Sequence, residues 1–91
     1  MKKVVAEFNV VGFTAEQYNR VIQDLEAAGK EVSEGRINHV AAEKPDGLLI
    51  IDVWESEEAL NRFSKTLVPV LEKNGVKPAQ PTVLPLHNII A

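Results

Sequence analysis

Hydrophobic and polar positions alternate over residues 3–11, where apolar side chains stand at Val4, Ala6, Phe8 and Val10. This period of two predicts a β-strand. Thr14 follows, with Gln17 three residues later, and this capping-box pattern predicts the start of a helix. The spacing then changes to three and four, in an apolar stripe formed by Tyr18, Val21, Ile22, Leu25 and Ala28. Gly29 is placed to end this helix in the left-handed conformation.

The middle of the chain has the pattern of a β-hairpin. Residues 30–36 form a polar run that predicts a connection. Residues 37–43 and 48–54 are predicted strands, because they flank the turn signal Lys44-Pro45-Asp46-Gly47. Segment 48–54 is apolar at nearly every position, which is typical of a strand that is covered on both faces.

A second helix is predicted to begin after Ser56, an N-cap residue followed by Glu57 and Glu58 at the positive end of the helix dipole. Its buried face consists of Leu60, Phe63, Leu67, Val70 and Leu71. Pro69 falls inside this pattern and lacks the N–H that the preceding turn needs, so we expect a kink or a break there. Gly75 is expected to close the helix.

The last strand is predicted over residues 82–90, after a proline-containing loop at 77–81. Pro85 inside this strand favours an edge position or a bulge, since proline cannot donate to a ladder. The resulting order is βαββαβ, which predicts a single ferredoxin-like α+β domain over residues 1–91. Both helices would lie on one face of a four-stranded antiparallel sheet.

This arrangement leaves the second face of the sheet uncovered, although segment 48–54 has the pattern of a strand that is buried on both faces. A second copy of the chain is the most economical cover, and twofold dimers are the commonest oligomers. We therefore expect a homodimer in which two sheets stack into a barrel. The alternative is a monomer whose second face is merely somewhat apolar, because folded surfaces are largely apolar in any case.

Composition narrows the classes of partner and of compartment. A net charge of -3 and a pI near 5.3, with scattered basic residues, argue against nucleic acid as a partner. The apolar fraction of 45% is ordinary and argues against a membrane span. Glu7 and Asn9 interrupt any signal-peptide pattern, so a cytoplasmic location is expected. Zero cysteines agree with this location and exclude disulfides, thiolate catalysis and cysteine-bound zinc.

Hairpin geometry predicts which side chains lie together. If the turn leaves Lys44 opposite Gly47, the register places His39 across from Asp52 and Ile37 across from Trp54. One face would then carry Ile37, His39, Ala41, Ile50, Asp52 and Trp54. The other would carry Asn38, Val40, Ala42, Leu49, Ile51 and Val53, joined by Val4, Ala6, Phe8 and Val10 of the first strand.

His39 and Asp52 are the candidate catalytic residues. A carboxylate on one imidazole nitrogen fixes the tautomer and raises the basicity of the ring, so this pair could act as a general base. The alternative is a buried polar pair that only satisfies itself. A hairpin loop with a bulge would shift the register and dissolve the pair.

Four further residues are candidates for binding a ligand. Trp54 offers a flat surface and one N–H donor for stacking on an aromatic ligand, although such a residue is often core. Asn9 shares a strand face with Glu7 and could reach a pocket, or be exposed at the end of the sheet. His87 lies on the last strand, and Phe63 lies in the second helix. Two lone histidines do not form a metal motif, so no metal is expected.

Residues Asp52 to Leu60, DVWESEEAL, lead from a strand into a helix. This junction resembles that of the antibiotic biosynthesis monooxygenase-like family, whose members form dimeric α+β barrels. The family includes oxygenases that oxidise polyketide-type or quinol substrates without metal or flavin, relatives that degrade haem, and members with no assigned activity. Its pockets lie between the helices and the sheet. The resemblance therefore implies a cleft lined by Trp54, Asp52 and His39, with the apolar face as the dimer seam.

Two departures from the family pattern bear on function. Asn9 and Trp54 match positions that haem-degrading relatives use, but the second helix has no histidine, and Ser64 stands near the place of the iron ligand. The histidine that many oxygenase-like members carry near the start of this helix is also missing. Two alternatives stay open. One is a cofactor-independent monooxygenase acting on a small aromatic, polyketide- or quinol-like substrate, and the other is a non-catalytic homodimeric module that binds or senses a small ligand.

Overall fold

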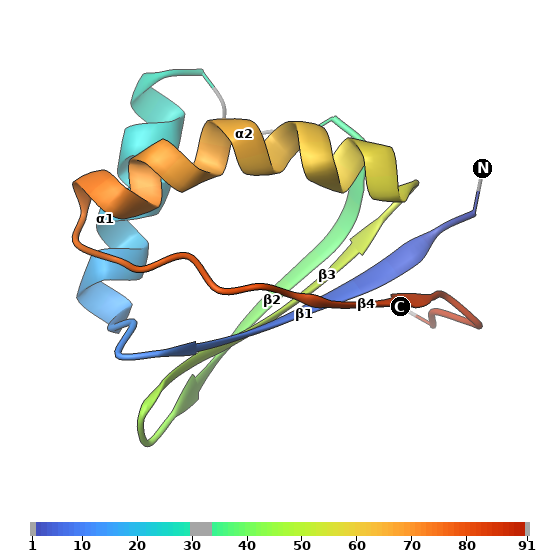
Figure 1. Ribbon diagram of the computed structural model, residues 1–91, viewed down its shortest axis with the longest axis horizontal. Helices are drawn as coiled ribbons and strands as arrows, with labels where there is room; N and C mark the ends of the chain where they lie inside the picture. The colour runs from blue at the N-terminus through green and yellow to red at the C-terminus, as the bar shows by residue number, and fades with distance from the viewer. Residues whose placement is uncertain (1, 30–33, 91) are drawn as a thin grey trace.

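A computed structural model describes residues 2–29 and 34–90 of the chain. The elements follow in the order β1 (Val4–Val11), α1 (Ala15–Ala27), β2 (Arg36–Lys44), β3 (Gly47–Trp54), α2 (Glu57–Lys73) and β4 (Thr82–Pro85). Figure 1 shows both helices on one side of the sheet. The predicted ferredoxin-like fold, with two helices on a four-stranded antiparallel sheet, is confirmed.

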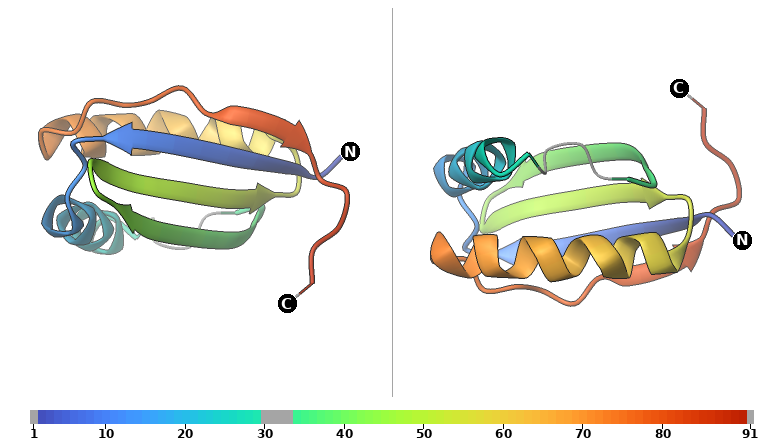
Figure 2. Two further views of the ribbon diagram at one scale, coloured as in Figure 1. Left: turned by 90° about the horizontal axis from the view of Figure 1, so that it is seen from below. Right: turned by 90° about the horizontal axis from the view of Figure 1, so that it is seen from above.

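The strands lie in the order β2-β3-β1-β4, and each pairs antiparallel with its neighbours. Figure 2 shows the uncovered face of the sheet from below and the helix-covered face from above. β4 lies at one edge, as Pro85 predicted. It ends at Pro85, and the chain beyond it runs past the end of the sheet instead of continuing as a strand to residue 90.

The ends of the elements follow from the residues that stand there. The Thr14 side chain accepts a hydrogen bond from the Gln17 N–H, and the Gln17 side chain accepts one from the Thr14 N–H, which completes the predicted capping box. Ser56 accepts from the Ala59 N–H at 3.2 Å and caps α2. At the tip of the hairpin, a Cβ on Gly47 would lie 2.1 Å from the Val10 carbonyl oxygen, so only glycine fits there.

Two apolar clusters fill the space between the helices and the sheet. The larger one consists of Val10, Phe13, Val21, Leu25, Leu48 and Val76. The smaller one, formed by Val4, Ala6, Trp54, Ala59 and Leu60, lies under the start of α2. Phe8 and Phe63 pack against both clusters and join them into one core.

The structure corrects the predicted face of the first strand. Ala6 lies opposite Asp52 in the β1–β3 register, and Asp52 lies opposite His39 in the β2–β3 register. Residues Val4, Ala6, Phe8 and Val10 therefore share the face of His39 and Asp52. The physical reason is that both helices bury their apolar stripes against this face. The apolar residues of β1 therefore lie on the same face, where they pack against the helices.

A second correction concerns the start of β2. The register shifts between Arg36 and Asn38, so Arg36 and not Ile37 lies opposite Trp54. A bulge of this kind inserts one residue into a strand and reverses the alternation of faces beyond it. Ile37 is consequently 42% exposed.

α2 continues through Pro69, without the predicted break, over Glu57–Lys73. The connection predicted over residues 30–36 lies in part outside the described residues, at 30–33. Within the described ranges, neither helix is long and apolar enough to cross a membrane.

Candidate active site

The helices and the sheet enclose a cavity of about 70 Å³. Apolar side chains from both helices and the sheet form most of its wall, and these include Phe8, Val10, Phe13, Val21, Ile22, Leu25, Ile50, Phe63, Leu67, Leu71 and Val76. Five side chains bring polar groups to this wall, namely Tyr18, Arg36, His39, Asp52 and Lys77. Lys77, Pro78 and Ala79, which follow α2, complete it. The cavity thus combines an apolar body with a small group of polar residues.

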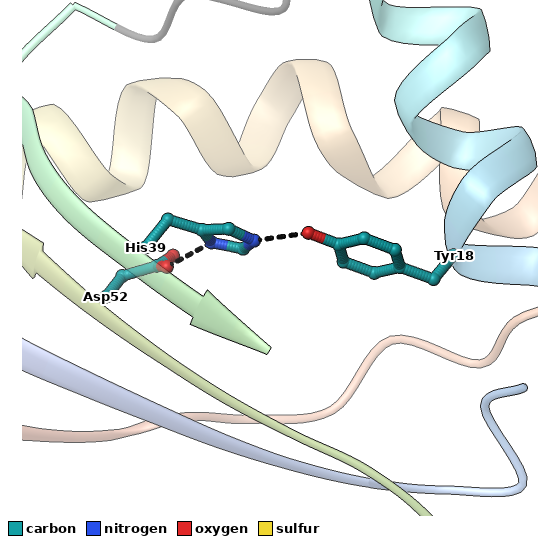
Figure 3. A network of polar contacts seen from close by, with 3 residues as sticks. All are labelled: Tyr18, His39 and Asp52. Atoms are coloured by element: carbon teal, nitrogen blue, oxygen red, sulfur yellow. Dashed lines mark hydrogen bonds and ion pairs between the residues drawn. The ribbon is translucent and has the colours of Figure 1, made fainter. Parts of the chain in front are cut away.

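Tyr18, His39 and Asp52 form a continuous line of hydrogen bonds across three elements (Figure 3). His39 Nδ1 lies 2.5 Å from Asp52 Oδ1, and His39 Nε2 lies 2.7 Å from the Tyr18 hydroxyl. The Tyr18 and His39 rings are nearly parallel, with an angle of 10° between their planes. The opposition of His39 and Asp52 that the hairpin register predicted is confirmed.

The chemistry of the three groups fixes the direction of these bonds. An ionised carboxylate can only accept, so His39 donates its Nδ1–H to Asp52. The other nitrogen of a neutral imidazole is then an acceptor, and the Tyr18 hydroxyl donates to Nε2. Asp52 is buried, and its bond to His39 gives the carboxylate the partner that a buried charge requires. The basic nitrogen of His39 therefore faces Tyr18 and the cavity.

The ionisation of Tyr18 reflects this setting. Burial raises the pKa of the Tyr18 phenol above its ordinary value of 10.0, the positive charge of Arg36 acts against this rise, and the negative charge of Asp52 adds to it. Tyr18 is therefore a neutral hydroxyl at neutral pH, able to donate one hydrogen bond and to accept others.

Arg36 reaches the cavity because of the bulge at the start of β2. Its guanidinium carbon lies 5.7 Å from the centre of the Phe63 ring, within the range of a cation–π contact. Phe63 in turn packs against Trp54, with ring centres 5.5 Å apart. This contact holds the positive charge at the wall that also carries His39 and Asp52.

The structure brings three of the six sequence-predicted site residues to the cavity, and these are His39, Asp52 and Phe63. Trp54 is fully buried in the smaller core cluster and does not line the cavity, and its Nε1–H has no partner among the described residues. Asn9 lies on the uncovered face, where its Oδ1 accepts a hydrogen bond from Lys44. His87 is exposed in the segment after β4.

Two residues of the site were not identified from the sequence. Tyr18 belongs to the apolar stripe of its helix, and its hydroxyl is the one polar group in that stripe. Arg36 showed no anion-binding motif, and only the bulge turns it toward the cavity. No group of three or more histidine, aspartate or glutamate residues that could hold a metal ion occurs in the described ranges.

No protein-family model and no curated protein matches this sequence. Solved structures do match. A provisionally named antibiotic biosynthesis monooxygenase from Caulobacter crescentus has a TM-score of 0.53 and 20% identity over 97% of this chain and 89% of that one. A second protein with the same provisional name, from Chloroflexus aurantiacus, has a TM-score of 0.54 and 16% identity over 98% and 95% of the two chains. The chain thus has the fold of these proteins, as the resemblance of its strand–helix junction predicted.

Proposed function

We propose that this protein is a monooxygenase that acts without a cofactor on a small aromatic, polyketide- or quinol-like substrate bound in the cavity. The observation that carries the proposal is the line of hydrogen bonds from Asp52 through His39 to Tyr18, which ends in a largely apolar cavity. A general base in such a place can remove a proton from a weakly acidic substrate. The enclosed volume of about 70 Å³ favours a substrate with one ring, whose remainder projects through the mouth of the cavity.

The proton passes along this line. Asp52 holds the imidazole in the tautomer that leaves Nε2 basic, and it stabilises the imidazolium that forms. Because Tyr18 occupies Nε2, a substrate hydroxyl gives its proton to the Tyr18 oxygen while the Tyr18 proton moves to His39. Tyr18 stays neutral throughout, which agrees with its raised pKa.

The oxidation balances without a further reductant. The quinol hydroxyl loses its proton to the Tyr18–His39 line, and the ring carbon next to the resulting oxyanion forms a C–O bond with dioxygen. The peroxide takes up a proton and then loses water as its O–O bond and the C–H bond of that carbon break, which leaves a carbonyl group. The ring gives up four electrons and the two oxygen atoms accept them, one in the product and one in water. The apolar wall keeps bulk water away from these intermediates.

Oxygen uptake with 1,4-hydroquinone tests this proposal. We expect a 2-hydroxy-1,4-quinone that contains one atom from labelled dioxygen, as measured by mass spectrometry. His39→Ala should lower the enzymatic rate by about 10²-fold or more, as for loss of a general base. Asn38→Ala, one residue away on the uncovered face, is the matched control and should keep the full rate. If His39→Ala and Asp52→Ala both fold and retain the wild-type rate, the catalytic assignment is wrong.

The second candidate is a non-catalytic module that binds or senses a small ligand. The closed line of hydrogen bonds favours it, because Tyr18, His39 and Asp52 satisfy one another without a substrate. In that case the wild-type protein binds quinol-like molecules without any oxygen uptake above the uncatalysed background.

We also propose that the protein is a homodimer built on the uncovered face of the sheet. Three large apolar side chains are exposed on this face, and these are Val11 at 70%, Val40 at 51% and Leu84 at 58%. Apolar side chains gathered on one face are typical of an interaction surface. The oligomeric state in solution tests this proposal.

A further inference from the structure

Arg36 brings a permanent positive charge to a largely apolar cavity. It is half-buried, it lines the cavity with His39 and Asp52, and its guanidinium lies over the Phe63 ring. An arginine side chain stays protonated at any ordinary pH. The charge is therefore a fixed feature of the site, whatever the ionisation of its neighbours.

This charge has no carboxylate partner within residues 2–29 and 34–90. The ion pairs there join Asp52 to His39, Asp46 to Lys44, and Asp24 to Lys73. Asp52, the carboxylate in the cavity wall, is thus bonded to the imidazole. A half-buried guanidinium of this kind is suited to a bound oxyanion, with which it forms strong charge-assisted hydrogen bonds.

The positive charge also acts at the point where a substrate proton would leave. Arg36 lowers the pKa of the Tyr18 hydroxyl against the larger effect of burial, so its field reaches the end of the hydrogen-bond line. An anion formed beside Tyr18 would lie in the same field. The geometry places a base, a relay hydroxyl and a cation around one volume.

We infer that Arg36 is the anion-binding residue of the cavity and that the ligand is a weak acid, a phenol or an enol, held there as its anion. This inference rests on the proposed function and names the class of its substrate. When the ligand binds, its O–H bond breaks and an O–H bond forms on Tyr18, while the Tyr18 proton forms an N–H bond at His39 Nε2. His39 and Asp52 are then an ion pair, and the ligand anion pairs with Arg36, so every charge has a partner.

Absorbance titration with 4-nitrophenol tests the inference, because its phenol and phenolate forms absorb at different wavelengths. The matched probe is 4-nitroanisole, the methyl ether, which cannot ionise. We expect the wild-type protein to bind the phenol as phenolate. Arg36→Gln should raise the Kd for the phenolate by about tenfold or more, the usual value of one charge-assisted hydrogen bond, and leave that for the ether unchanged. Arg36→Lys keeps the charge but loses the planar guanidinium, so its Kd for the phenolate should lie between those of the wild type and of Arg36→Gln.

Arg62→Gln is the matched control, since it removes an exposed arginine of α2 that does not line the cavity, and it should change neither Kd. The inference is overturned if the wild-type protein binds no 4-nitrophenol or binds it only as the neutral phenol. An equal loss of affinity for the phenol and the ether in Arg36→Gln also overturns it, as does a loss of phenolate affinity in Arg62→Gln equal to that in Arg36→Gln. Should Arg36→Gln not fold, Arg36→Met keeps the aliphatic contact with Phe63 and carries the same prediction.

Oxygen uptake separates this inference from the proposed function. Arg36-dependent phenolate binding without oxygen uptake contradicts the monooxygenase but supports the anion site. Uptake that depends on His39 and is unchanged in Arg36→Gln contradicts the anion site alone.

Discussion

At the scale of the residue, the hydrogen bonds of a few polar atoms determine which groups of the cavity wall can accept a proton. Asp52 is buried beside the small side chain of Ala6, and it has His39 as its partner. His39 would leave Nε2 open to the cavity if Tyr18 did not donate to it. The same two hydrogen bonds therefore satisfy the buried groups and orient the imidazole, so the proposed catalytic role is compatible with a structural one.

Tyr18 is the only tyrosine of the chain, so its ionisation can be followed directly. Burial raises its pKa, and we expect the tyrosinate absorbance to appear with a midpoint above 10.0. Since the folded pKa lies above the unfolded one, this group supports folding fully below pH 10 and loses that contribution as the pH rises through the folded pKa. As the pH rises from about 9 to 11, the melting temperature should therefore fall more in the wild type than in Tyr18→Phe. A midpoint at or below 10.0 contradicts this account.

Part of the site was predictable from the sequence, because a two-residue turn sets the register of a hairpin. With Lys44 opposite Gly47, every pair as far as His39 and Asp52 follows by counting. The counting fails at Ile37, where a bulge adds one residue and places Arg36 opposite Trp54. The position of a bulge depends on how both faces of the sheet pack, and no local residue pattern at Arg36 predicts one.

At the scale of the element, a polar cluster joins α1 to the C-terminal end of α2. Asn74, the residue that caps α2, donates from Nδ2 to Asp24 Oδ2 of α1 at 2.9 Å and to the Val70 carbonyl at 2.9 Å. Gln17, near the start of α1, donates to the Asn74 carbonyl. Lys73 lies 3.6 Å from Asp24 and adds an exposed ion pair. These contacts link α1 to the end of α2 and so help to set the space between helices and sheet.

Asp24 should report on this link. The hydrogen bond from Asn74, followed by the charge of Lys73, holds the pKa of the Asp24 carboxyl below its ordinary value of 3.8. Because the folded pKa is the lower one, the contribution to folding is present above pH 3.8 and is lost as the pH falls through the folded value. In an NMR titration, Asn74→Ala should raise the pKa of Asp24 toward 3.8, and Lys73→Ala should raise it less. The opposite order, or no change in Asn74→Ala, contradicts the role of Asn74.

The helix ends were predictable from the sequence, but the continuation of α2 through Pro69 was not. Caps are local, and the hydrogen bonds at Thr14 and Ser56 depend on residues within three positions. The effect of Pro69 depends on what its neighbours pack against. Leu67, Val70 and Leu71 all contact the larger core cluster, and Pro69 itself is exposed. Interrupting the helix would uncover these side chains, so the helix continues despite the lost hydrogen bond.

On the scale of the whole molecule, the two faces of the sheet differ less than the sequence predicted. The helix-covered face takes the apolar half of β1, so Glu7 and Asn9 fall on the uncovered face beside its apolar residues. That face is therefore mixed. On β3, Leu49 and Ile51 are half-buried and Val53 is buried within one copy of the chain. The apolar character of β3 thus supports the proposed dimer less than the exposed apolar residues of β1, β2 and β4 do.

A homodimer on this face should be visible by light scattering, with a particle of twice the chain mass of 10.0 kDa at micromolar concentration. Val40→Lys should shift the mass to that of a single chain. In a twofold interface the same patch meets its own copy, so each dimer would bury two added charges. Gln23→Lys, on the exposed side of α1, is the matched control and should remain dimeric. A wild-type particle of 10.0 kDa, or a Val40→Lys variant that keeps the wild-type mass, would show that this face is not the interface.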